Sequence, residues 1–140
     1  IDNFDITSYG KSLDIKDFDL SFVKGLSFED GCATITKFSA HLIAKGIETI
    51  SKINNLIPKI NLICGGGRKN SFLIKSISNY LIDKNIKLEN IDNYGFDGDF
   101  IESQAFGYLA IRTYLNLPNS FPNTTRCKKE TIGGEINKSF

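Results

Sequence analysis

The stretch best suited to chemistry is Cys-Gly-Gly-Gly-Arg-Lys-Asn at 64–70, between an apolar run and a helix-like segment. Glycine has no Cβ, so the backbone N–H groups of Gly65, Gly66 and Gly67 can approach a ligand closely. The start of the next helix adds unpaired N–H donors and the positive end of the helix dipole. With the charges of Arg68 and Lys69, these features favour binding of a nucleotide phosphate or ribose. The alternative is a tight strand-to-helix turn in which Asn70 is the helix N-cap.

A second candidate is Glu102, three residues after Asp99 at the start of a helical pattern. In one interpretation the two form a capping box, with Asp99 as N-cap. In the other, Glu102 faces a cleft from the first helical turn and accepts a hydrogen bond from a substrate hydroxyl. Asp97 and Asp99 without further ligands are typical of a solvated turn, so we predict no metal ligand in this chain.

Three other features are interpreted as structural. Gly10-Lys11-Ser12 resembles the end of a P-loop, but Asp5 stands where the first glycine belongs and no apolar strand precedes it. His41, the only histidine, lies in the middle of a helical pattern without a nucleophile nearby in the sequence. Cys64 ends an apolar strand and is predicted to be a core thiol.

Helices and strands alternate along the chain and must position these residues. Ser27 and Asp30 form a capping-box pattern before apolar residues at helical spacing, and Pro58 prevents that helix from continuing. The patterns predict helices from 27, over 70–83 and over 99–116, and strands at 60–64, 86–89 and 131–136. Residues 120–126 are interpreted as a loop. The order predicts an α/β fold in which helices flank a sheet.

Composition narrows the function classes. The 140 residues are the length of one domain, and a formal net charge of +1 argues against a nucleic-acid-binding protein that depends on a basic field. No apolar stretch is long enough for a membrane span. Three cysteines without a C-x-x-C pair favour a reducing cytoplasm. The absence of Met leads us to expect a piece of a longer protein.

Several motifs together resemble the C-terminal part of anhydro-N-acetylmuramic acid kinases. They are CGGGRKN at 64–70, NYGFDGDFIESQAFGYLAIRTYL at 93–115, LPNSFPNTT at 117–125 and IGGEI at 132–136. The segment ATITKFSAHLI at 33–43 also resembles its counterpart. Order and spacing agree over about 11–138, which is almost the whole chain.

The resemblance implies an actin-like ATPase fold, in which two ribonuclease-H-like lobes with mixed sheets flank a cleft. Residues 1–140 would form the C-terminal lobe. The implied reaction uses ATP and Mg²⁺ to phosphorylate O6 of 1,6-anhydro-N-acetylmuramic acid while water opens the anhydro ring. The product is N-acetylmuramic acid 6-phosphate, in cytoplasmic cell-wall recycling. The implied partners are ATP, the amino sugar, the N-terminal lobe and, in a homodimer, a second copy; no nucleic acid or membrane is implied.

Residue roles follow from the same resemblance. Gly65, Gly66, Gly67 and Asn70 match the nucleotide-binding loop, and Glu102 matches the glutamate that holds the sugar near the attacking water. The family's general base and first phosphate loop belong to the N-terminal lobe, so no catalytic residue is expected here and the isolated chain should be inactive.

The chain departs from the family pattern at two places. Arg126 stands where the family usually has Gly, and Lys11-Ser12 lacks the flanking prolines and Arg-Glu. Two alternatives therefore stay open: a non-catalytic remnant or interaction module of the kinase fold, or a different sugar kinase of the same superclass.

Overall fold

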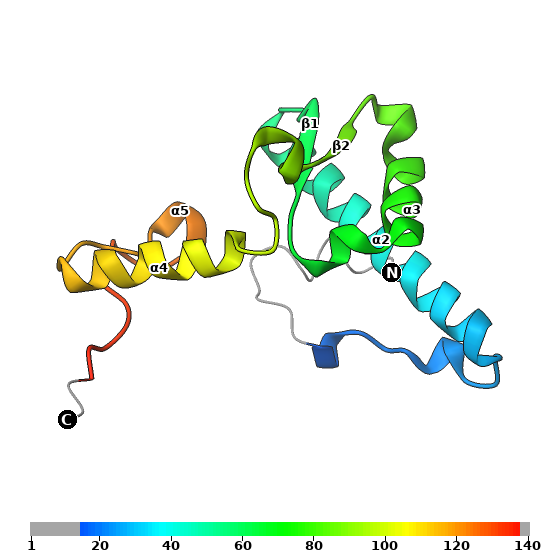
Figure 1. Ribbon diagram of the computed structural model, residues 1–140, viewed down its shortest axis with the longest axis horizontal. Helices are drawn as coiled ribbons and strands as arrows, with labels where there is room; N and C mark the ends of the chain where they lie inside the picture. The colour runs from blue at the N-terminus through cyan, green and yellow to red at the C-terminus, as the bar shows by residue number, and fades with distance from the viewer. Residues whose placement is uncertain (1–14, 138–140) are drawn as a thin grey trace. The chain divides into compact units, whose positions relative to one another are not determined.

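The computed structural model describes residues 15–137, which divide between two compact units, Ile1–Gly98 and Asp99–Phe140. The first unit contains the helices α2 (Phe28–Asn54) and α3 (Ser71–Leu81) and the strands β1 (Ile60–Ile63) and β2 (Lys87–Asn90) (Figure 1). The second contains α4 (Ile101–Tyr114) and the one-turn α5 (Pro122–Thr125). Lys11 and Ser12, with the rest of 1–14, lie outside the described residues.

Helices α2 and α3 begin where their N-cap residues predict. The Ser27 hydroxyl accepts the backbone N–H of Asp30 at 3.1 Å and donates to the Asp30 carboxylate at 2.9 Å. The Asn70 side chain likewise accepts the backbone N–H of Leu73 at 3.0 Å and starts α3. Each cap satisfies a donor that the first helical turn leaves unpaired. The predicted starts of both helices are confirmed.

Among residues 15–98, the sheet consists of two parallel strands, with Ile60 paired to Lys87 and Ile63 to Asn90. Helix α3 supplies the crossover between the strands. The sequence predicts a buried first strand, but Ile60 and Leu62 stay about half exposed. Parallel strands are fully buried where helices cover both faces of the sheet, and the described residues leave the face with Ile60 and Leu62 partly uncovered.

The core of the first unit lies where α2 and α3 pack together, with Ile86 beside them. Ala40 and Ala44 of α2 are buried against Ile77 and Leu81 of α3. The two alanines are four residues apart, so they share one face of α2 and let α3 come close. This packing fixes the direction from which α3 approaches the glycine-rich loop.

The second unit differs from its sequence-based interpretation in three places. The strand predicted at 131–136 is wrong, because only an isolated antiparallel bridge joins Thr131 to Ser120. The loop predicted at 120–126 contains the short helix α5. Arg126 ends α5 with a left-handed φ of 56°, a conformation that favours glycine. The mixed α/β architecture with helices flanking a small sheet is nevertheless the predicted class.

Candidate functional site

The glycine-rich loop lies at the carboxyl end of β1. The carboxyl end of β2 is its neighbour, because Ile63 pairs with Asn90 in the parallel register. In open α/β sheets, ligands bind outside the carboxyl ends of the strands. The loop, the end of β2 and the N-terminus of α3 therefore meet where this architecture places ligand sites.

The three glycines of the loop have different local requirements. Gly65 has φ 76° and ψ 176°, which L side chains rarely adopt, so the backbone itself requires glycine there. Gly66 has no such constraint, and a Cβ built on it would meet no protein atom within 4 Å. A Cβ on Gly67 would make only an ordinary 3.7 Å contact with Leu73. The fold thus requires one glycine of the three, and the space beside Gly66 is open.

A polar network holds this loop against the 91–98 turn. The Arg68 side chain is 6% exposed, and its Nε lies 3.0 Å from a carboxylate oxygen of Asp92. Arg68 also donates to the carbonyl of Gly65 at 3.0 Å, and the Gly65 N–H donates to the carbonyl of Gly98 at 2.8 Å. Arg68, predicted to add charge for a phosphate, is instead held in contacts that fix the loop.

Asp92 is the acceptor at the centre of this network. It accepts the backbone N–H of Gly98 at 2.7 Å in addition to Arg68. The Gly98 hydrogen bond, followed by that from Arg68, lowers the pKa of Asp92 below its ordinary value of 3.8. A Cβ on Gly98 would lie 2.6 Å from Arg68 Nε, so a larger residue there would displace the Arg68 side chain from this position. Sequence analysis missed Asp92, since no short-range pattern links it to Arg68.

Glu102 lies in the second unit, whereas Gly65, Gly66, Gly67 and Asn70 lie in the first. The predicted capping box is wrong: α4 begins at Ile101, so Phe100 is the N-cap and has no side-chain oxygen to accept a hydrogen bond. Glu102 is exposed in the first turn and makes no hydrogen bond or ion pair with the described residues. The structural explanation that competed with a substrate contact is thereby removed.

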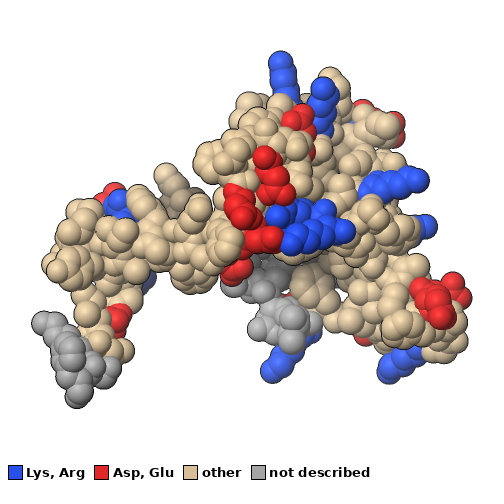
Figure 2. Space-filling view, in the orientation of Figure 1, with Lys and Arg blue, Asp and Glu red and all other residues tan. Residues whose placement is uncertain are grey.

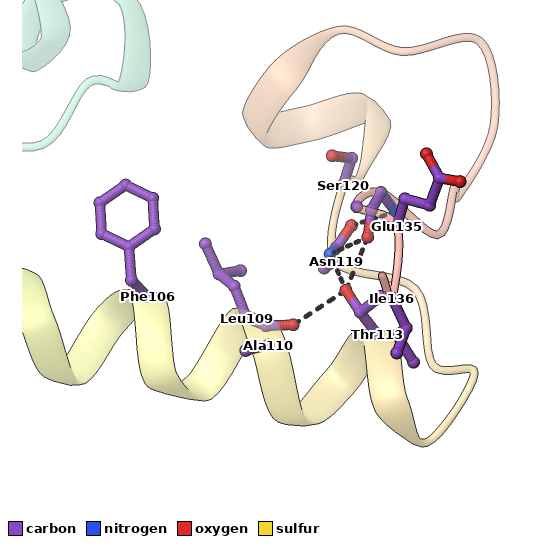
Figure 3. A pocket seen from close by; sticks show the side chains of 10 residues that line it. Phe106, Leu109, Ala110, Thr113, Asn119, Ser120, Glu135 and Ile136 are labelled. Atoms are coloured by element: carbon purple, nitrogen blue, oxygen red, sulfur yellow. Dashed lines mark hydrogen bonds between the residues drawn. The ribbon is translucent and has the colours of Figure 1, made fainter. Parts of the chain in front are cut away.

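The second unit contains a pocket of about 480 Å³ between α4 and the C-terminal segment (Figure 3). The Asn119 amide accepts the N–H of Gly133 at 2.6 Å and donates to the carbonyl of Gly133 at 2.9 Å. Thr113 of α4 donates to the same carbonyl at 2.6 Å. These bonds join the LPNSFPNTT and IGGEI motifs, a contact that sequence analysis did not predict. The side chains that remain towards the pocket include the apolar Phe106 and Leu109.

Of the remaining candidates, His41 lies on α2 and Cys64 lies between β1 and Gly65. The ring of His41 packs edge-on against Tyr80 at 5.2 Å, in agreement with a structural role. Cys64 is exposed, so its prediction as a core thiol is wrong. Within residues 15–137, no cluster of three or more His, Cys, Asp or Glu side chains is placed to hold a metal ion. None of the helices described there has the length and apolar character of a membrane span.

Comparison with known proteins places the sequence of this chain in one family. The family model described as anhydro-N-acetylmuramic acid kinase matches residues 14–139. The kinase of that name from Pelagibacter ubique (strain HTCC1062) is 54% identical over 144 residues, covering 100% of this chain and 38% of the relative. Anhydro-N-acetylmuramic acid kinase 2 from Jannaschia sp. (strain CCS1) is 38% identical, covering 91% of this chain and 32% of the relative. The chain thus spans less than half the length of these relatives.

Proposed function

The chain belongs to the anhydro-N-acetylmuramic acid kinase family, and we propose that it contributes part of the ATP and sugar sites of such a kinase. The proposed reaction transfers the γ-phosphoryl group of ATP to O6 of 1,6-anhydro-N-acetylmuramic acid. Water adds at C1 as the anhydro bridge opens, giving N-acetylmuramic acid 6-phosphate and ADP. Cell-wall recycling in the cytoplasm would use this product. Residues 1–140 would serve as the C-terminal part of the two-lobed enzyme.

The open space beside Gly66 is the observation that carries the nucleotide half of this proposal. Gly66 and Gly67 are not required by backbone strain or by close packing within the described chain. Their N–H groups precede the 11-residue helix α3, whose N-terminus favours negative charge. Gly65, Gly66, Gly67 and Asn70 would bind ATP here, with Asn70 acting through its cap on α3.

Arg68 and Asp92 would support this site without touching the nucleotide. Their ion pair holds the loop in one conformation, and a prearranged loop loses less conformational entropy when ATP binds. Mg²⁺ bound to ATP would neutralise phosphate charge during transfer. Such an ion is held largely by phosphates and water, so it needs no protein cage, and we assign no residue of this chain to it.

Glu102 would form the sugar half of the site. Its carboxylate is exposed in the first turn of α4 and is not used by a cap. A carboxylate in this state can accept hydrogen bonds from sugar hydroxyls or from the water that attacks C1. The general base is assigned to the other part of the kinase, because the family places it in the N-terminal lobe.

Calorimetric titration of Mg–ATP into this chain tests the nucleotide site. Gly66→Asp is the variant expected to disrupt binding. The new carboxylate would enter the open space and repel phosphate, so we expect affinity to fall by 10-fold or more, about 1.4 kcal/mol. Gly31→Asp is the matched control, because Gly31 also has open space around it and lies in α2. Equal affinity of both variants and the parent would contradict the proposed site.

A further inference from the structure

A second pocket lies in the first unit, at the end of the sheet opposite to the glycine-rich loop. The loop follows the carboxyl end of β1, whereas Ile57 of this pocket precedes β1 and Ile86 directly precedes β2. Strands of four residues separate the two ends of the sheet by about 13 Å. The pocket has a volume of about 680 Å³, within the range of sites that hold drug-sized ligands. It therefore lies apart from the glycine-rich loop.

The ends of two helices form most of the wall of this pocket. The last turns of α2 contribute four residues that recur at helical spacing and share one face: Glu48, Ser51, Lys52 and Asn55. Asp83 and Lys84 come from the 3-10 turn Ile82–Lys84, which continues α3. Ile86 belongs to the buried core, which fixes this part of the wall. Because both helices end here, the negative ends of their dipoles lie at the pocket.

The four charged side chains of the pocket are only partly paired. Lys84 Nζ lies 2.6 Å from a carboxylate oxygen of Glu48, and this ion pair joins the 3-10 turn to α2. Within residues 15–137, the side chains of Lys52 and Asp83 make no hydrogen bond or ion pair. One ammonium group and one carboxylate therefore remain for a ligand, in a pocket that also contains isoleucine side chains.

We propose that this pocket binds a zwitterion of dipeptide size, whose ammonium group pairs with Asp83 and whose carboxylate pairs with Lys52. The negative helix ends also favour the ammonium group. An apolar side chain of the ligand would cover Ile57, which is 64% exposed. Figure 2 shows basic and acidic side chains mixed over the first unit, so its surface favours a ligand with both charges over a polyanion.

The test is a titration of the 140-residue chain with L-alanyl-L-leucine, followed by the backbone amide signals in nitrogen–hydrogen correlation NMR spectra. The amides of 51–57 and 82–86 should shift and saturate with a Kd of about 1 mM, because exposed ion pairs contribute little each. The amides of 65–70, in the glycine-rich loop, should not shift.

Two blocked forms of the dipeptide test which charges are recognised. N-acetyl-alanyl-leucine lacks the ammonium group, and alanyl-leucine amide lacks the carboxylate. Each should bind about 5-fold more weakly than the free dipeptide, because each loses one ion pair with the pocket.

Asp83→Asn and Lys52→Gln assign each charge to its partner. Asp83→Asn should weaken binding of the free dipeptide about 5-fold and leave the affinity for the acetylated form unchanged. Lys52→Gln should weaken the free dipeptide similarly and leave the affinity for the amide form unchanged. Glu29→Gln in the first turn of α2 and Lys75→Gln in α3 are matched controls outside the pocket, and neither should change binding.

Three results would overturn the proposal. Absence of saturable shifts at 51–57 and 82–86 up to about 20 mM dipeptide would mean that the pocket is not a binding site for this class of ligand. Equal affinity for the free and blocked dipeptides would assign the pocket to an apolar ligand. Equal effects of the pocket variants and their controls would remove the two assigned contacts. Failure of the proposed nucleotide site would not affect this test, because the titration contains no ATP.

Discussion

The two units contain a similar share of apolar residues, but among the described residues only the first forms a buried core. The difference is whether a second helix packs against the apolar face of the first. In the first unit, α2 places Ala40 and Ala44 on one face, and α3 covers them with Ile77 and Leu81. In the second unit, α4 carries apolar residues on several faces, and nothing between 99 and 137 buries them. A core therefore depends on a second apolar face to pack against as much as on hydrophobic composition.

The residues proposed to bind ATP and the sugar follow the same division. Gly65, Gly66 and Gly67 stand on a loop held by Arg68 and Asp92, and the helix behind them is packed. Glu102 stands on a helix without buried residues in the described chain. A catalytic or binding side chain must be held within a fraction of an ångström to be effective. The proposed nucleotide half of the site is therefore largely preformed in this chain, whereas the proposed sugar half at Glu102 has no packed core behind it in the described residues.

The largest effect expected from this comparison is on stability. Leu81 is completely buried, and Leu81→Ala should cost the first unit about 2–5 kcal/mol in unfolding free energy, through lost burial and a cavity. Leu109→Ala makes the same chemical change in α4, where the side chain is 37% exposed, and should cost about 0.5 kcal/mol or less.

Urea unfolding of the isolated chain, followed by circular dichroism, measures both variants. The Leu81→Ala midpoint should fall well below that of the parent, while the Leu109→Ala curve should overlap it. Equal losses for the two leucines would mean that α4 already belongs to a core in the isolated chain, and the contrast between the units would be wrong.

Sequence alone predicts the parts of this structure that depend on neighbouring residues. Ser27 with Asp30 and Asn70 with Leu73 form caps within one helical turn, so their spacing is visible in the sequence. The contact between Arg68 and Asp92 joins residues 24 positions apart and depends on the parallel pairing of β1 and β2. Such a contact has no local pattern, so sequence analysis considered Arg68 only as added charge for a phosphate.

The errors in the second unit have a related cause. Residues 131–136 have strand composition, but a strand forms only with a partner, and a single bridge from Thr131 to Ser120 is all that the described chain provides. The Asp99–Glu102 spacing satisfies the capping pattern, yet α4 begins two residues after Asp99. Sequence patterns predict secondary structure least reliably where tertiary contacts, and not neighbouring residues, select the conformation.

The second prediction concerns the pH dependence of the loop. The folded-state pKa of Asp92 is lowered, so its contribution to stability is present above the unfolded value near 3.8 and is lost as pH falls through the folded pKa. Asp92→Asn should therefore lower the urea midpoint at pH 7, and the difference from the parent should shrink as pH approaches 3.

Asp83→Asn is the control for this pH effect. Asp83 lies on an exposed turn after α3 and makes no hydrogen bond or ion pair with the described residues. Its substitution should leave the midpoint unchanged at pH 7. If Asp92→Asn behaves in the same way, the network does not stabilise the loop, and the first unit would be no better prearranged than the second.

The smallest effect is expected at Arg126, which ends α5 in a left-handed conformation. Its left-handed φ of 56° costs a residue with a Cβ about 1–2 kcal/mol, whereas glycine loses about 0.5–1 kcal/mol more backbone entropy on folding. The strain is the larger quantity, so Arg126→Gly should stabilise α5 by about 0.5 kcal/mol. Thermal unfolding measures this gain in a chimera in which these 140 residues replace the matched region of the Pelagibacter ubique kinase, because there the second unit unfolds with the rest of the kinase. A lower melting temperature would show that contacts of the arginine outweigh the strain, and that the second unit already uses this side chain for packing.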